Sequence, residues 1–187
     1  MKKYFTYIVL ILVFASCNQV EKPLIAFYYW KTNFSLSTLE KEALQDNQVQ
    51  KIYIRYFDID LHPKTNQAFP VSPVHFLIQP PVKTIVPVVY IKNKVMLKTD
   101  FDSKKLARQT YDFVQLINAK NNLSCQEIQI DCDWTLESKT NYLQFIEDFK
   151  RLSGKKLSAT IRLHQVKYFE KTKIPNVDSA VLMYYNM

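Results

Sequence analysis

The sequence is almost devoid of glycine. Its 187 residues include a single one, Gly154. The phosphate-binding motifs G-x-G-x-x-G and G-x-x-x-x-G-K-[ST] each need at least two, so nucleotide sites of the Rossmann and P-loop types are excluded. The nucleophile elbow of serine hydrolases also needs glycine near a strand end, and it is excluded as well. Gly154 follows a helical pattern, which predicts that it ends a helix.

Cysteine and histidine are also scarce, with three of each. Neither H-E-x-x-H nor a Cys/His ligand spacing is present, so we predict no metal centre and no cofactor. Cys125 and Cys132 fall at the two ends of a predicted strand. At ~3.3 Å per residue they would lie roughly 23 Å apart, far beyond the ~7 Å limit for a disulfide. We therefore expect no disulfide bond between them.

The N-terminus begins with Lys2 and Lys3, an apolar run, small residues and Cys17. This order is typical of a secretory signal, and the run is short for a membrane-spanning helix of ~20 residues. Residues 14–17 (Phe-Ala-Ser-Cys) resemble the lipobox of bacterial lipoproteins. The resemblance implies a signal peptide over 1–16, a lipid on Cys17 and a tether over 17–23. It also implies an exported protein whose lipid binds a membrane of the cell envelope. An ordinary signal peptide or an uncleaved anchor is the alternative.

The remaining chain, 24–187, has the size and composition of one domain. Hydrophobic residues make up 48% of the sequence and aromatic residues 14%, too much for a disordered chain. The net charge of +8 is spread over short basic pairs. We interpret it as a solvated surface that favours anionic lipid, and we predict no nucleic-acid partner.

Six runs have the apolar or alternating pattern of strands, at 24–30, 51–60, 84–91, 127–134, 156–163 and 180–187. Helical periodicity lies between most of them, clearest at 106–117 behind Asp102 or Ser103 and at 142–152 before Gly154. A shorter pattern at 39–44 follows Ser35 or Ser37. The proline-rich segment 61–83 predicts a long loop with one helical turn near 74–77. Alternation of strands and helices predicts a parallel sheet with helices outside.

Polar residues inside two of these strands favour a barrel. In 127–133 the residues Glu127, Gln129, Asp131 and Asp133 share one face, and in 157–164 a polar set again alternates with an apolar set. A doubly wound sheet would bury both faces under helices, whereas a barrel can hold polar side chains in its interior. We therefore predict a (β/α)8 TIM-barrel type fold. It is apparently incomplete, with six of eight strands, since such barrels take about 250 residues. An open parallel α/β sheet, or an antiparallel sheet with one wet face, is the alternative.

Short motifs in these strands resemble those of family-18 chitinases. Residues 131–134 (Asp-Cys-Asp-Trp) resemble the end of the fourth-strand signature Asp-x-x-Asp-x-Asp-x-Glu, in which Trp often precedes the Glu. Residues 183–186 (Met-Tyr-Tyr-Asn) resemble the sixth-strand Met-x-Tyr-Asp/Asn, and residues 28–30 (Tyr-Tyr-Trp) occupy the place of a first-strand aromatic platform. The chain is also similar to bacterial lipoproteins predicted to contain glycosidase-like barrels. These resemblances imply a carbohydrate ligand, bound or cleaved.

The resemblance has two departures. The position of the catalytic Glu is Thr135, and the first Asp of the signature falls on Ile128. Chemistry that depends on that Glu is therefore not supported. The candidate catalytic residues are Asp131 and Asp133, as coupled carboxylates. The candidate substrate-binding residues are Trp30, Asp58, Asp60, Trp134, Arg162, Tyr185 and Asn186.

Other functions stay open. The strand carboxylates could form a structural ion network with Arg55 and Arg162 as partners. The protein could be a non-catalytic binding lipoprotein or a truncated, inactive gene product.

Overall fold

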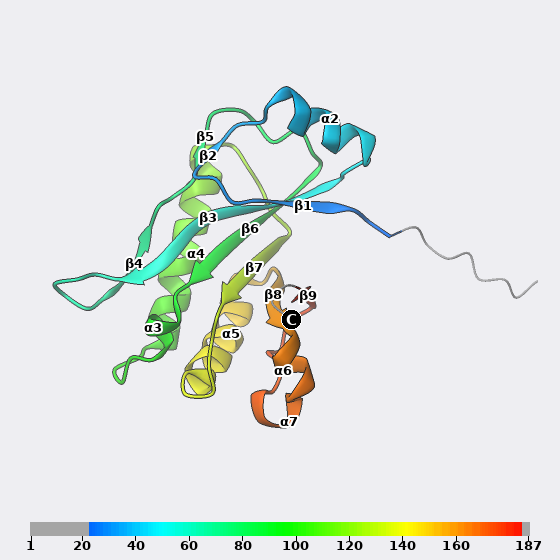
Figure 1. Ribbon diagram of the computed structural model, residues 1–187. Helices are drawn as coiled ribbons and strands as arrows, with labels where there is room; N and C mark the ends of the chain where they lie inside the picture. The colour runs from blue at the N-terminus through cyan, green and yellow to red at the C-terminus, as the bar shows by residue number, and fades with distance from the viewer. Residues whose placement is uncertain (1–22, 185–187) are drawn as a thin grey trace, which may run out of the picture.

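A computed structural model describes residues 23–184, whose centre is a curled half-barrel of six parallel strands (Figure 1). The strand order is β1-β3-β6-β7-β8-β9, and each neighbouring pair is parallel. The strands are β1 (Ala26–Tyr29), β3 (Lys51–Leu61), β6 (Thr84–Ile91), β7 (Glu127–Cys132), β8 (Lys156–Arg162) and β9 (Ser179–Met183). The predicted α/β class and the six predicted strands are confirmed.

Three main helices connect these strands: α2 (Thr38–Asp46), α4 (Ser103–Lys120) and α5 (Lys139–Ser153). Ser37 and Asp102 cap the first two by accepting hydrogen bonds from the third backbone N–H of each helix. Gly154 ends α5 with φ of 59°, a left-handed conformation that strains residues with a Cβ. The predicted role of Gly154 as a helix terminator is confirmed. The shorter helices are α3 (Asn93–Met96), α6 (Leu163–Lys167) and α7 (Phe169–Thr172).

The predicted helical turn at 74–77 is wrong. This segment is extended and contains β5 (His75–Phe76), which pairs with β2 (Asn33–Phe34), while β4 (Ala68–Val71) pairs antiparallel with β3. The backbone N–H groups of Val74 and His75 donate to the carbonyls of Tyr56 and Thr32. Pairing with distant backbone therefore outweighs the local helical pattern.

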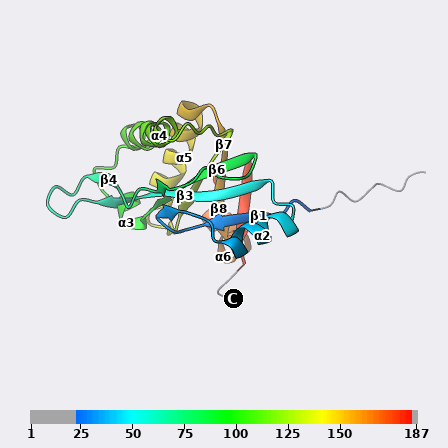
Figure 2. The ribbon, with the colours of Figure 1, turned by 90° about the horizontal axis from the view of Figure 1, so that it is seen from above.

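The hydrophobic core lies on the convex side of the sheet. Ile54, Ile128 and Ile130 point outward from their strands and are fully buried against α4 and α5 with Phe145 and Phe149. In the view from above, α4 and α5 lie together on one side of β3 and β6 (Figure 2). No helix within residues 23–184 has the length and apolarity needed to cross a bilayer.

A β-bulge in β3 determines which of its side chains face the inside of the half-barrel. The register against β6 shifts between Arg55 and Phe57, so Tyr56 and Phe57 both turn to the convex core. Without the extra residue, Arg55 and Asp58 would lie on opposite faces, because strand side chains alternate. With it, both face the concave side, where the polar residues of β7 and β8 also lie.

Candidate functional site

Towards the amino ends of the strands, the concave face is a buried polar layer. Glu127 is paired with Lys51 at 2.8 Å and accepts a 2.7 Å hydrogen bond from Ser158. The phenol of Tyr28 donates to Gln129 at 2.8 Å. Tyr28 and Gln129 lie on β1 and β7, with β3 and β6 between them, so in a flat sheet their backbones would be roughly 14 Å apart. The contact therefore depends on the curl of the sheet.

Asp131 lies beyond this layer, near the carboxyl end of β7. It is 8% exposed, and its Oδ1 accepts a 2.6 Å hydrogen bond from Thr160. Burial raises the pKa of Asp131, and the charges of Asp133 and Asp58 raise it further. The hydrogen bond from Thr160 and the charge of Arg162 act in the opposite direction. Asp131 is thus a carboxylate whose surroundings favour the protonated form more than water does.

Asp133 lies just beyond β7 at the rim, where its side chain is 41% exposed. It forms an ion pair with Arg162 of β8, as the candidate partnership predicted. Tyr90 of β6 donates to the other carboxylate oxygen at 3.3 Å. Burial and the nearby charge of Asp133 raise the pKa of Tyr90 to about 12. Tyr90 is therefore a neutral hydrogen-bond donor at the rim.

The two aspartates at the end of β3 each have cationic partners. Asp58 is paired with Arg55 through two contacts of 2.5 and 2.6 Å. The prediction that Arg55 pairs with a carboxylate of β7 is wrong, because the bulge places Asp58 on the same face and closer in sequence. Asp60 lies between Lys92 and Lys94 at 2.6 and 2.5 Å. Although burial opposes its ionisation, these hydrogen bonds lower the pKa of Asp60 to about 2.

A row of stacked aromatic rings borders the carboxylates. The rings of Trp30 and Tyr28 are 5.8 Å apart and 9° from parallel, and those of Tyr28 and Tyr53 are 4.7 Å apart. Trp30 is 42% exposed. Tyr29 points the other way into the convex core, where its ring packs on Phe34. Trp30, Tyr28 and Tyr53 are the aromatic row of the site.

The structure places Trp134 elsewhere. Its indole is 4% exposed and stacks on Tyr142 of α5 at 5.5 Å. Trp134 therefore stabilises the helix side of the sheet, and its prediction as a ligand contact on the concave face is wrong. Ile128, at the first position of the chitinase signature, is likewise a residue of the convex core. Tyr185, Asn186 and the lipidation candidate Cys17 lie outside the described residues.

Sequence reasoning missed three side chains of the site: Tyr53, Tyr90 and Thr160. Each alternates with apolar neighbours on its own strand, which is the only signal that the sequence contains for its direction. Their proximity to Glu127, Asp133 and Asp131 depends on the strand order, which no local pattern encodes.

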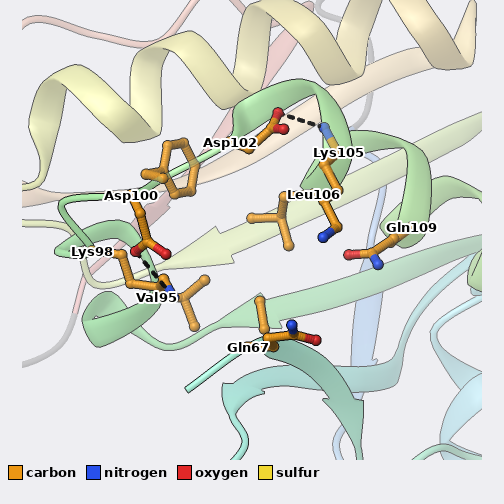
Figure 3. A pocket seen from close by; sticks show the side chains of 10 residues that line it. Gln67, Val95, Lys98, Asp100, Asp102, Lys105, Leu106 and Gln109 are labelled. Carbon is orange, nitrogen blue, oxygen red and sulfur yellow. Dashed lines mark hydrogen bonds and ion pairs between the residues drawn. The ribbon is translucent and has the colours of Figure 1, made fainter. Parts of the chain in front are cut away.

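The described residues also contain cavities outside this site. One of about 270 Å³ lies between α4, α3 and β4, where Lys98 pairs with Asp100 and Asp102 caps α4 (Figure 3). An adjoining cavity of about 620 Å³ is lined by apolar residues such as Phe57, Phe113 and Leu116. Both are on the convex side, away from the carboxylates and the aromatic row. Within residues 23–184, His, Cys, Asp and Glu form no group of three or more that could hold a metal.

Comparison with known proteins supports the fold. No protein-family model and no curated protein sequence matches the chain. Among solved structures, the chain is similar to the chitinase domain of the spore coat protein CotE from Clostridium difficile, with a TM-score of 0.51 and 14% sequence identity. The similarity covers 90% of this chain and 52% of that domain, so the chain spans about half of the chitinase domain's length. The fold is like that of this domain: a half-barrel of parallel strands with helices on its convex side, consistent with an incomplete TIM-like barrel or an open α/β sheet.

The position of the expected catalytic Glu carries no acid. Thr135 is exposed in the loop after β7, where its N–H donates to Ser138 at 2.9 Å. The carboxylates that face the concave side near the strand ends are Asp58, Asp60, Asp131 and Asp133. Chemically, this arrangement offers an exposed indole at the end of an aromatic stack, several fixed hydrogen-bond partners, and buried carboxyl groups of which Asp131 has no ion pair among the described residues.

Proposed function

We propose that the protein is a lipid-anchored protein of the bacterial cell envelope whose concave face binds glycans. The observation that carries the proposal is the aromatic row beside Asp131 on the concave face of a glycosidase-like fold. The apolar face of a sugar ring packs on an aromatic ring, and hydroxyl groups pair with fixed carboxylates. The proposal is supported by the exposure of Trp30, which is 42% exposed, and by Asp131 and Asp133 facing the same concave side.

Binding is tested by titrating a panel of glycan oligomers into the purified full chain. Trp30→Ala removes the exposed ring and is expected to weaken binding at least about tenfold, since stacking and the buried apolar area are both lost. Leu39→Ala is the matched control, because Leu39 is an exposed apolar residue of α2 away from the row. Binding that Trp30→Ala leaves unchanged would contradict the proposed site.

Hydrolysis is the second candidate function. It is favoured by the raised pKa of Asp131, which suits a general acid, beside the ionised pair of Asp133 and Arg162. The same glycan panel, assayed for reducing ends, separates binding from cleavage. If the protein cleaves glycans through this pair, Asp131→Asn abolishes turnover while binding persists. Turnover that survives in both Asp131→Asn and Asp133→Asn would exclude the pair.

The anchor has its own test. Mass spectrometry of the protein from its native membrane is expected to find lipid on Cys17 and residues 1–16 removed. Cys17→Ala should move the protein from the detergent phase to the aqueous phase. An unmodified Cys17 in the membrane-derived protein would contradict the lipoprotein proposal, and it would leave the glycan site unaffected.

A further inference from the structure

The charges around Asp131 do not balance. Three carboxylates meet at the carboxyl ends of β3 and β7: Asp58, Asp131 and Asp133. Two guanidinium groups face them, and each is committed to one carboxylate, Arg55 to Asp58 and Arg162 to Asp133. Asp131 has no ion pair of its own among the described residues, and Thr160 is the one group there that donates a hydrogen bond to it. One negative charge is therefore left without a counter-charge.

The other basic side chains of the concave face form ion pairs with carboxylates other than Asp131. Lys51 pairs with Glu127 at the opposite end of β7, and Lys92 and Lys94 both contact Asp60. The side chains of Lys92 and Lys94 are 40% and 54% exposed at the rim, so water screens their charges. Asp131 is much more buried, so a charge placed beside its carboxylate would interact with it more strongly than at the exposed rim.

The aromatic row reaches this carboxylate. The Tyr28 phenol is bonded to Gln129, two residues before Asp131 on the same strand and the same face. Burial raises the pKa of Tyr28, and the negative charge of Asp131 contributes to that rise. A sugar ring that packs on the exposed Trp30 at the end of the row would lie on the same concave face as Asp131. Aromatic faces themselves attract cations.

We infer that the site prefers glycans that carry a free amine, that is, glucosamine units that are not acetylated. An ammonium group on the sugar would supply the missing counter-charge to Asp131, and the ring would stack on the aromatic row. Charge-assisted hydrogen bonds of this kind are about twice as strong as neutral ones. An N-acetyl group or a hydroxyl group at the same place would leave Asp131 uncompensated. The inference rests on the proposed function, because it names the ligand class of the same site.

The test compares three hexamers of equal length on the full chain by calorimetry: glucosamine, N-acetylglucosamine and glucose. At pH 6 and low salt, the glucosamine hexamer is expected to bind about tenfold or more tightly than the other two. Asp131→Asn should reduce this preference to within about twofold. Asp100→Asn is the matched control, because Asp100 is exposed on the convex side, and it should keep the preference.

A second measurement does not depend on any variant. The preference of the unmodified protein should fall as Asp131 takes up a proton at acidic pH, and it should fall with added salt. The titratable and charged groups that surround Asp131 are Tyr28, Arg55, Asp58, Tyr90, Asp133 and Arg162. Of these, Asp58 and Asp133 are each paired with an arginine.

The outcomes separate the two proposals. Equal binding of all three hexamers, or a preference that survives in Asp131→Asn, would overturn the amine preference and leave glycan binding intact. If the protein bound neither the three hexamers nor any other glycan in the panel, the proposal of glycan binding itself would be contradicted. A preference that is independent of pH and salt would also overturn the inference, because it would not arise from charge.

Discussion

At the scale of the residue, Asp131 combines an unfavourable effect on stability with a proposed role in binding. The residue is 8% exposed, its carboxyl group has no ion pair among the described residues, and burial raises its pKa. The other four carboxylates of the concave face are each paired with a basic side chain. A buried charge of this kind is unfavourable for folding and is often found at functional sites. The same feature makes Asp131 the residue whose substitution is most informative.

We predict that Asp131→Asn raises the free energy of unfolding at pH 7. A carboxyl whose pKa is higher in the folded state binds more protons there, so stability decreases as pH rises through the interval above its ordinary pKa. The amide removes that loss and still accepts the hydrogen bond from Thr160. The gain should be full at pH 7 and should disappear as pH falls towards about 4, the ordinary range of an aspartate. Urea denaturation of both proteins between pH 4 and 7 measures it.

A wild-type protein that is more stable than Asp131→Asn at pH 7 would contradict this prediction. It would mean that the surroundings of Asp131 stabilise its ionised form. The argument that Asp131 has no counter-charge, on which the amine preference depends, would then also be wrong.

At the scale of the element, the local sequence predicts where the main helices begin and end, but it does not predict which strands pair. Ser37, Asp102 and Gly154 delimit their helices where the sequence indicated. The segment 74–77 was predicted to form one helical turn, yet it is extended because its backbone N–H groups donate to the carbonyls of Tyr56 and Thr32. The bulge in β3 is a second case. Its register shift depends on β6, and it reverses the face on which Asp58 lies.

Gly154 provides the prediction at this scale. Gly154→Ala should destabilise the protein by about 1 kcal/mol, because alanine is strained at positive φ. No atom lies within 4 Å of the position that a Cβ would occupy, so the loss arises from the backbone alone. Gly154→Asn should cost less, since asparagine tolerates this conformation. Urea midpoints of the two variants test the order, and an equal or larger loss for asparagine would contradict it.

At the scale of the whole molecule, the half-barrel presents two open strand edges. Among the described residues, β1 pairs only with β3 and β9 pairs only with β8. Apolar side chains are exposed at both edges on the convex side, including Phe27 on β1 and Leu182 on β9, the latter 44% exposed. An unpaired edge with apolar neighbours invites association with other strands.

We therefore predict that the purified chain of 187 residues self-associates at micromolar concentrations. Leu182→Lys should reduce this association, because a charged side chain at an edge opposes pairing. Analytical ultracentrifugation over a range of concentrations measures the effect, with Leu39→Lys on α2 as the control for added charge. Equal association of Leu182→Lys and the control would show that the β9 edge is not involved.

The sequence by itself determined the six strands of the parallel sheet, the three main helices, the parallel α/β class and the polar face of β7. These features depend on local patterns: alternation along a strand, helical periodicity and capping residues. The tertiary structure alone decided which polar residues meet. It brought Tyr28 to Gln129 across two intervening strands, placed Arg55 on Asp58 and turned Trp134 into the convex core. The physical reason is that curl, register and bulges arise from the packing of the whole sheet, and a site made from several strands inherits its geometry from them.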